Sequence, residues 1–281
     1  MIAGLLMAVS GAGAGLFGSL LGLGGGILIV PLLTLGFGLP LREAVGVSLV
    51  SVIVTSSAAA GVYLERHVAN LRLGMTLELF TATGALVGGL VAFALPDRVL
   101  AGLFALLLAY TAVIMLRRSL SRSSGSSPEA SSIDGAAGAA VAGPTAEVGF
   151  VASLGGPTYR VLRFPFGIVG SIFAGLVSAL LGVGGGIVKV PLMNLAMGVP
   201  LRVATATSNL MIGITASASA IVYFLRGGID PYIAAPTAIG VFIGATAGSR
   251  LAHRVDVRVL RVLFIVVLAY TAWEMFTKAL S

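Results

Sequence analysis

The sequence predicts an all-α polytopic membrane protein. Hydrophobic residues make up 58% of the 281 positions and charged residues 10%, whereas a soluble domain carries roughly 25% charged residues. The charges are also segregated, since residues 2–41, 44–64 and 231–249 contain no Asp, Glu, Lys or Arg. Such runs match the roughly 20 residues that a helix needs to cross about 30 Å of hydrocarbon. The alternating pattern of a membrane β-barrel is missing.

The chain repeats itself once. Residues 22–32 read GLGGGILIVPL and residues 182–192 read GVGGGIVKVPL, an offset of 182 − 22 = 160. LAYTA at 108–112 recurs at 268–272 with the same offset, 268 − 108 = 160. An ungapped repeat of this length indicates two homologous halves. We therefore predict three parts, with boundaries at 1–118 (first transmembrane repeat), 119–163 (linker) and 164–281 (second transmembrane repeat).

Each half is predicted to contain five membrane helices, of which the first two form a hairpin broken by glycines. In the first half we place them at 2–21, 27–38, 43–64, 73–95 and 98–117. In the second half the corresponding ranges are 164–181, 187–198, 202–225, 231–250 and 257–277. The linker is rich in Ser, Gly and Ala, and its first part cannot bury enough apolar surface to order itself.

The distribution of Lys and Arg predicts the orientation. If each broken hairpin returns to its starting side, 12 of the 16 loop Lys and Arg residues share the side of the linker and 4 share the other. If the hairpin crosses once, the split is 9 to 7. The positive-inside rule favours the first arrangement. It makes the two repeats inverted, with the linker cytoplasmic and both termini outside, a plan that secondary transporters often use.

The two glycine breaks are the first candidates for a binding site. Glycine is a poor helix former, so a new short helix is expected to begin just after each break. The free N–H groups of its first turn and the positive end of its dipole favour an anion. The candidate residues are Gly24, Gly25, Gly26 and Ile27 in the first break and Gly184, Gly185, Gly186 and Ile187 in the second. The alternative is that these glycines only allow close helix packing, which we favour for Gly84, Gly88, Gly240, Gly244 and Gly248.

Two charged residues fall inside apolar segments. Lys189 has Ile29 as its equivalent in the first half, and a charge inside a membrane is a functional candidate. It could bind substrate, which its place three residues beyond the break favours, or extend to the membrane surface. Glu78 could be a protonatable coupling group or a partner of Arg72 at the interface, and we favour the second interpretation.

Neutral hydroxyl and amide groups complete the candidate site. The helices predicted over 43–64 and 202–225 are rich in Ser and Thr, whose side chains either bind an anion or bond back to helix carbonyls. We select Ser48, Ser208 and Asn209, which lie at equivalent or adjacent positions of the repeat. HExxH, GxSxG and Walker patterns do not occur, and Cys is absent. We therefore expect no enzyme activity, no cofactor and no metal site.

The duplicated GxGGGxxxxPL, each copy followed by Pro-Leu-Arg and a Ser/Thr-rich helix, resembles the TauE/SafE sulfite exporter family, also called the 4-toluene sulfonate uptake permeases (TSUP). The likeness covers nearly the whole chain outside the linker. The resemblance implies a permease of the bacterial inner membrane for sulfur-containing anions such as sulfite, thiosulfate or organosulfonates. The residues themselves indicate only an anion.

The functional prediction is a secondary transporter of small sulfur-containing anions that works by alternating access. The alternatives are an anion channel with the same pore, a permease for a cation or another small metabolite, and a membrane scaffold without a substrate. The expected partners are the anion, the lipid bilayer and, as a possibility, a second copy in a homodimer. The net charge of +7 lies mainly in loops and does not indicate nucleic-acid binding.

Overall fold

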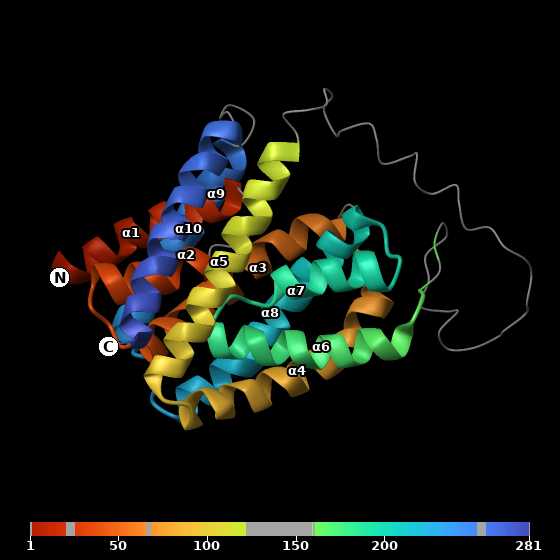
Figure 1. The fold of residues 1–281 in the computed structure, drawn as a ribbon, viewed down its shortest axis with the longest axis horizontal. Coiled ribbons are helices and arrows are strands. Elements are labelled where there is room, and N and C mark those ends of the chain that lie inside the picture. The colour runs from red at the N-terminus through yellow and green to blue at the C-terminus, as the bar shows by residue number, and fades with distance from the viewer. Residues whose placement is uncertain are drawn as a thin grey trace, which may run out of the picture.

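The computed structural model describes residues 2–20, 26–65, 69–121, 159, 161–251 and 257–280. The elements of the described chain are helices (Figure 1). Those of the first half are α1 (Ile2–Leu20), α2 (Gly26–Pro31), the π-helix η1 (Leu32–Gly36), α3 (Leu41–Glu65), α4 (Leu71–Ala94) and α5 (Asp97–Ser121). Those of the second half are α6 (Phe164–Leu181), α7 (Gly186–Pro191), the π-helix η4 (Leu192–Ala196), α8 (Leu201–Leu225), α9 (Pro231–Leu251) and α10 (Val257–Leu280).

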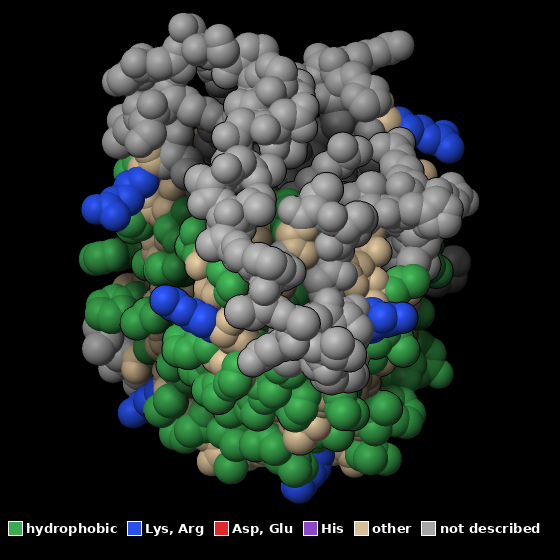
Figure 2. All heavy atoms as spheres, turned by 90° about the vertical axis from the view of Figure 1, so that its right-hand side faces the viewer, with side chains coloured by type: hydrophobic (Ala, Val, Ile, Leu, Met, Phe, Trp, Pro, Cys, Tyr) green, Lys and Arg blue, Asp and Glu red, His purple; other side chains and the backbone are tan. Residues whose placement is uncertain are grey.

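Five of these helices are long and apolar enough to cross a membrane. Their qualifying segments are Leu71–Ala94, Asp97–Ile114, Phe164–Leu181, Val203–Leu225 and Pro231–Gly248. Large hydrophobic side chains are widely exposed, among them Phe166, Leu106 and Trp273. Figure 2 shows one face on which hydrophobic side chains form a broad surface with Lys and Arg side chains around it. The prediction of a polytopic helical membrane protein is confirmed.

Two half-length helices follow the predicted glycine breaks. Helix α2 with η1, and α7 with η4, each contain 11 residues and span about 16 Å, roughly half of the hydrocarbon thickness. The helix changes from α to π after Pro31 and after Pro191, because proline lacks the N–H that a regular helical hydrogen bond needs. The following residues adopt the wider π-turn, in which Met197 N donates to Leu192 O at 3.2 Å. Neither half-helix crosses the membrane alone.

Helices of one half pack against helices of the other in reciprocal pairs. Helix α1 packs on α9 and α4 on α6, while α3 packs on α8 and α5 on α10; α4 and α6 run side by side in Figure 1. A Cβ added at Gly84 would lie 2.1 Å from the carbonyl oxygen of Ile172, and one at Gly244 would lie 1.9 Å from that of Ala12. These glycines allow backbone-to-backbone contact, which confirms the packing interpretation for both.

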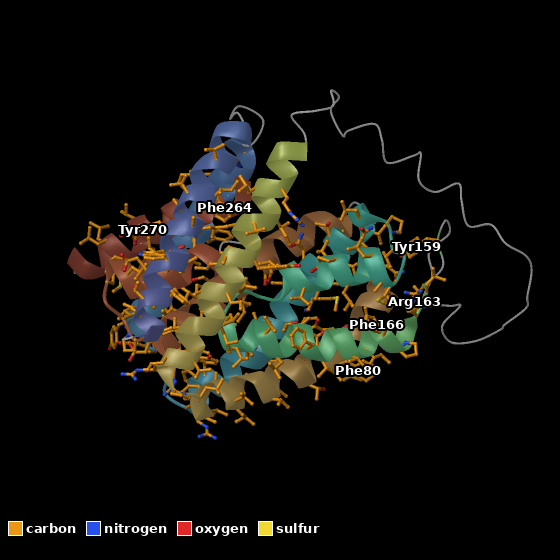
Figure 3. The ribbon with its side chains drawn as sticks, in the orientation of Figure 1. Phe80, Tyr159, Arg163, Phe166, Phe264 and Tyr270 are labelled. Atoms are coloured by element: carbon orange, nitrogen blue, oxygen red, sulfur yellow. The ribbon has the colours of Figure 1, made fainter. Side chains whose placement is uncertain are left out.

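The chain before α6 is attached to the body of the protein where it is described. Tyr159 accepts a hydrogen bond of 2.7 Å from the side-chain amide of Asn70, and Leu162 N donates to Met197 O at 3.0 Å. In Figure 3, Tyr159 and Arg163 lie at the same end of the molecule as Phe166, near the start of α6. These contacts fix the entry of α6, the helix that leads into the second glycine break.

Candidate functional site

The second glycine break reverses the chain inside the protein. Gly182, Gly184 and Gly185 have φ of 67°, 79° and 75°, a left-handed conformation that side chains disfavour. All three are buried. Helix α7 then begins at Gly186 with Gly185 as its N-cap, and no side chain caps it. The irregular backbone is therefore shielded from lipid, as membrane proteins require.

The first break is described only from Gly26 onward. The predicted donors Gly24 and Gly25 lie outside the described residues, whereas Gly26 starts α2 and Ile27 is buried. Helix α2 is buried along most of its length, but in α7 the buried residue is Lys189. Ile187, two residues before Lys189, is half-buried. The two half-helices thus occupy different surroundings despite their similar sequences.

Ser48 joins the two breaks. Its Oγ lies 2.7 Å from Gly182 O and 3.1 Å from Gly26 O, and a Cβ added at Gly26 would be 3.0 Å from Gly182 O. The two breaks are therefore in contact. A hydroxyl has one proton to donate, and in this conformation these carbonyls share that of Ser48. Ser48 is thus a link between the breaks, and its proton is not free for an anion.

Two other hydroxyls near the second break have no hydrogen-bond partner among the residues that the structure describes. Ser178 and Ser208 are 0% and 1% exposed, and neither Oγ has a hydrogen-bond partner within the described part of the chain. A Cβ added at Gly185 would lie 3.4 Å from Ser178 Oγ, and one at Gly186 would lie 3.7 Å from Ser208 Oγ. A buried unsatisfied hydroxyl costs about 1–3 kcal/mol, so both groups are poised for a polar ligand.

Sequence reasoning selected Ser208 but missed Ser178. The equivalent of Ser178 in the first half is Gly18. In the sequence, Ser178 therefore resembles one more small residue on a packing face. Asn209, the other selected residue of α8, is half-buried and forms no side-chain hydrogen bond within the described residues. Only the fold reveals that Ser178 faces the break.

Lys189 is fully enclosed and paired. Its side chain is 1% exposed, and its Nζ lies 3.2 Å from Glu78 Oε2. The same Nζ donates to Thr215 Oγ1, and Thr215 Oγ1 in turn donates to Glu78 Oε1. The three residues come from α7, α4 and α8, so Lys189 does not extend to the membrane surface.

The expected role of Glu78 was wrong. The sequence favours a partner of Arg72 at the interface, but Glu78 is 3% exposed and its carboxylate forms an ion pair with Lys189, 111 residues away. The signal was present in the sequence, because charges inside membrane segments tend to pair with one another. Glu78 and Lys189 are the two opposite charges within otherwise apolar segments that could satisfy that rule.

The ion pair and the second glycine break are connected by helix α7. Lys189 is three residues beyond Gly186, a rise of about 4.5 Å along α7. We refer to the two hydroxyls, the uncapped start of α7 and the ion pair together as the polar centre. Apolar side chains such as Val52, which lies against Gly26 and Gly184, are buried at the break as well. Since its polar groups are almost fully buried, this centre is closed to bulk water in the present conformation.

A cavity of about 330 Å³ lies away from this centre, at the end of η1. The charged residues Asp97, Arg98 and Lys278 line it together with apolar residues of the loop before α3. None of the candidate site residues belongs to its wall.

These features define a polytopic helical membrane protein with a closed polar centre between broken helices, as expected of a membrane transporter. A family model described as "Sulfite exporter TauE/SafE" matches residues 7–275. The chain therefore belongs to the TauE/SafE sulfite exporter family, a family of membrane transporters and not of enzymes.

Individual relatives support this assignment. The chain is 24% identical to "Probable membrane transporter protein YunE" of Bacillus subtilis, with 94% of each chain covered. It is 29% identical to "Probable membrane transporter protein MamO" of Magnetospirillum gryphiswaldense, but the match spans only 43% of that longer protein. "Sulfite exporter TauE/SafE family protein 6" of Arabidopsis thaliana is 31% identical over 44% of this chain and 28% of its own length. No solved structure matches the chain.

Proposed function

We propose that this protein is a secondary transporter of small sulfur-containing anions, such as sulfite or an organosulfonate, and that it works by alternating access. The observation that carries the proposal is the polar centre at the second glycine break. There Ser178 and Ser208 offer buried hydroxyls that have no hydrogen-bond partner among the described residues. Helix α7 begins without a side-chain cap and carries the cation Lys189. An oxyanion accepts hydrogen bonds from all three kinds of group.

The chemistry of the centre suits a transported substrate. Neutral hydroxyls and backbone amides bind an anion without holding it as tightly as a cluster of arginines would. Sulfur enters the proposal from the family, whose description names sulfite, and from the printed name of the Arabidopsis relative. The polar groups of the site support only the coarser proposal of a small oxyanion.

Alternating access is supported by the closed site and the reciprocal packing. The polar groups of the centre are buried, so a substrate can reach them only after helices separate. Pairing α1 with α9 and α4 with α6 is what two inverted repeats, 1–118 and 164–281, would produce around a shared axis. In this proposal the two halves rock against each other around the adjoining breaks, with the linker cytoplasmic and both termini outside the inner membrane.

The test is flux into proteoliposomes that contain the purified full-length chain. We expect saturable uptake of sulfite and of 4-toluenesulfonate, each competing with the other. Uptake that does not saturate would indicate a channel, and no uptake of either anion would contradict anion transport. A cation that raises thermal stability, when neither anion does so, would favour the cation permease. Cross-linking of the same sample tests whether the chain forms the homodimer that was considered as a possibility.

A further inference from the structure

The ion pair between Glu78 and Lys189 has an apolar counterpart in the same protein. The positions 160 residues away are Ala238 for Glu78 and Ile29 for Lys189. Both counterparts are buried, at 6% and 0% exposure. The fold therefore accommodates Ala and Ile at the positions equivalent to Glu78 and Lys189. Helix packing at these positions does not require a pair of opposite charges.

The hydroxyl of Thr215, whose repeat equivalent is Thr55, takes part in the ion-pair network. Thr55 Oγ1 bonds back to its own helix, 3.1 Å from Ser51 O. Thr215 Oγ1 also lies 3.0 Å from a carbonyl of its helix, Met211 O, but it additionally contacts both members of the ion pair. Thr215 is thus hydrogen-bonded to a charged pair whose repeat equivalents, Ala238 and Ile29, carry no charge.

Charges buried without need are costly. Burying an ion carries a penalty of several kcal/mol, and replacing a buried ion pair by apolar residues is often neutral or stabilising. A charge inside the membrane therefore points to function. Lys189 belongs to α7, the half-helix that begins at the proposed anion site, three residues beyond Gly186. A function of the pair therefore concerns the charge of the substrate.

We infer that Glu78 is the proton-coupling group of this transporter, so that one proton moves with each monovalent anion. The inference rests on the proposed anion transport. In the substrate-free state Glu78 neutralises Lys189. An arriving anion takes the place of the carboxylate beside the ammonium, and Glu78 accepts a proton from the same side of the membrane.

Charge balance dictates this order. With the anion bound, Lys189 is positive, the anion negative and Glu78 neutral, so the centre carries no net charge. Without substrate the pair of Lys189 and Glu78 is again neutral. An unprotonated Glu78 beside a bound anion would leave one uncompensated negative charge in the protein interior. On release the anion leaves, Glu78 gives its proton to the receiving side, and the ion pair forms again.

Few other charged groups face the pair. In the described helices α4, α6, α7 and α8 the remaining ionisable residues are Arg72, Arg202 and Tyr223. Arg72 is exposed at the start of α4, Arg202 is 13 residues from Thr215, and the hydroxyl of Tyr223 donates to Ala179 O at 3.1 Å. Glu78 is therefore the carboxylate of these helices that can exchange a proton at the centre.

The experiment measures anion and proton movement together in proteoliposomes. The probe is 4-toluenesulfonate, a sulfonate that stays ionised across the working pH range and carries no proton of its own. For the unaltered chain we expect about one proton to enter with each anion, and we expect an inwardly directed proton gradient to drive uptake. A potassium diffusion potential should not change the flux, because the loaded and the empty centre both cross the membrane without net charge.

Glu78→Gln is the decisive variant. Gln keeps the hydrogen-bonding shape but accepts no proton, so the empty site holds one positive charge and the loaded site none. We expect the proton-to-anion ratio to fall at least about tenfold and the flux to respond to membrane potential. Glu274→Gln, which removes a carboxylate on α10, is the matched control and keeps the original ratio. Lys189→Ile is expected to abolish saturable uptake.

The outcomes separate this inference from the function on which it rests. Saturable uptake without accompanying protons, or an unchanged proton ratio in Glu78→Gln, would overturn proton coupling while leaving anion transport standing. No saturable uptake of 4-toluenesulfonate or sulfite by the unaltered chain would overturn both.

Discussion

The buried ion pair allows a quantitative test of what the charges contribute to folding. Glu78 is 3% exposed. In Lys189→Ile its carboxylate keeps Thr215 as its hydrogen-bond partner within the described residues. Glu78→Ala leaves the ammonium of Lys189 in the same position. Breaking a buried pair by removing one partner costs about 3–5 kcal/mol, so the two single variants together should lose roughly 6–10 kcal/mol.

The double variant Glu78→Ala/Lys189→Ile should lose far less. It recreates the residues Ala238 and Ile29 that pack at the equivalent position. Thr215 Oγ1 keeps an acceptor at Met211 O, 3.0 Å away. Because no charge is left buried, we expect a loss of less than about 2 kcal/mol, or a gain.

The assay is equilibrium unfolding of the full chain in mixed micelles, titrated with a denaturing detergent and followed by circular dichroism. Asp97→Asn is the control, since it removes the ion pair of 3.1 Å with Arg42 at a side chain that is 62% exposed. We expect it to cost less than about 1 kcal/mol. If the double variant loses as much as the two single variants combined, the charges act separately and the reasoning from the repeat is wrong.

Three further predictions test the site, the packing and the orientation. Ser178→Ala and Ser208→Ala should raise the KM for anion uptake about tenfold each, because a hydrogen bond to a charged group is lost, without lowering stability. Ser219→Ala, whose hydroxyl bonds back to Thr215 O at 3.1 Å, should leave KM unchanged. Gly84→Ala should cost about 1–3 kcal/mol in the same unfolding assay, since its Cβ would lie 2.1 Å from a backbone oxygen of α6. Ser124→Cys should react with an impermeant maleimide in inverted vesicles but not in intact cells, and labelling in intact cells would contradict a cytoplasmic linker.

Local features of the sequence predicted much of the fold. Polyglycine followed by proline determines where helices stop and restart, because glycine and proline act on their own backbone. The structure accordingly has half-helices that begin at Gly26 and Gly186 and change at Pro31 and Pro191. The glycines at 84 and 244 were also assigned correctly to helix packing, since small residues four apart form a flat face.

The candidate site was predicted less completely. The sequence indicated Lys189 and Ser208, but it gave no sign that Ser178 faces the break or that the hydroxyl proton of Ser48 is used by two carbonyls. Glu78 was assigned to a near neighbour in the chain because Arg72 is only six residues away. These errors have one origin, since the rotation of α4, α6 and α8 about their own axes decides which side chains meet.

The sequence by itself determined a helical membrane protein with a duplicated glycine break and one lysine in the second copy. These properties depend on composition and on interactions within a few residues. Only the tertiary structure decided that the lysine is neutralised by a glutamate 111 positions away. It also decided that two hydroxyls beside the break lack hydrogen-bond partners within the described helices. The physical reason is that a charge or hydroxyl in the membrane interior must find its partner across helices, and helix packing selects which partner is within reach.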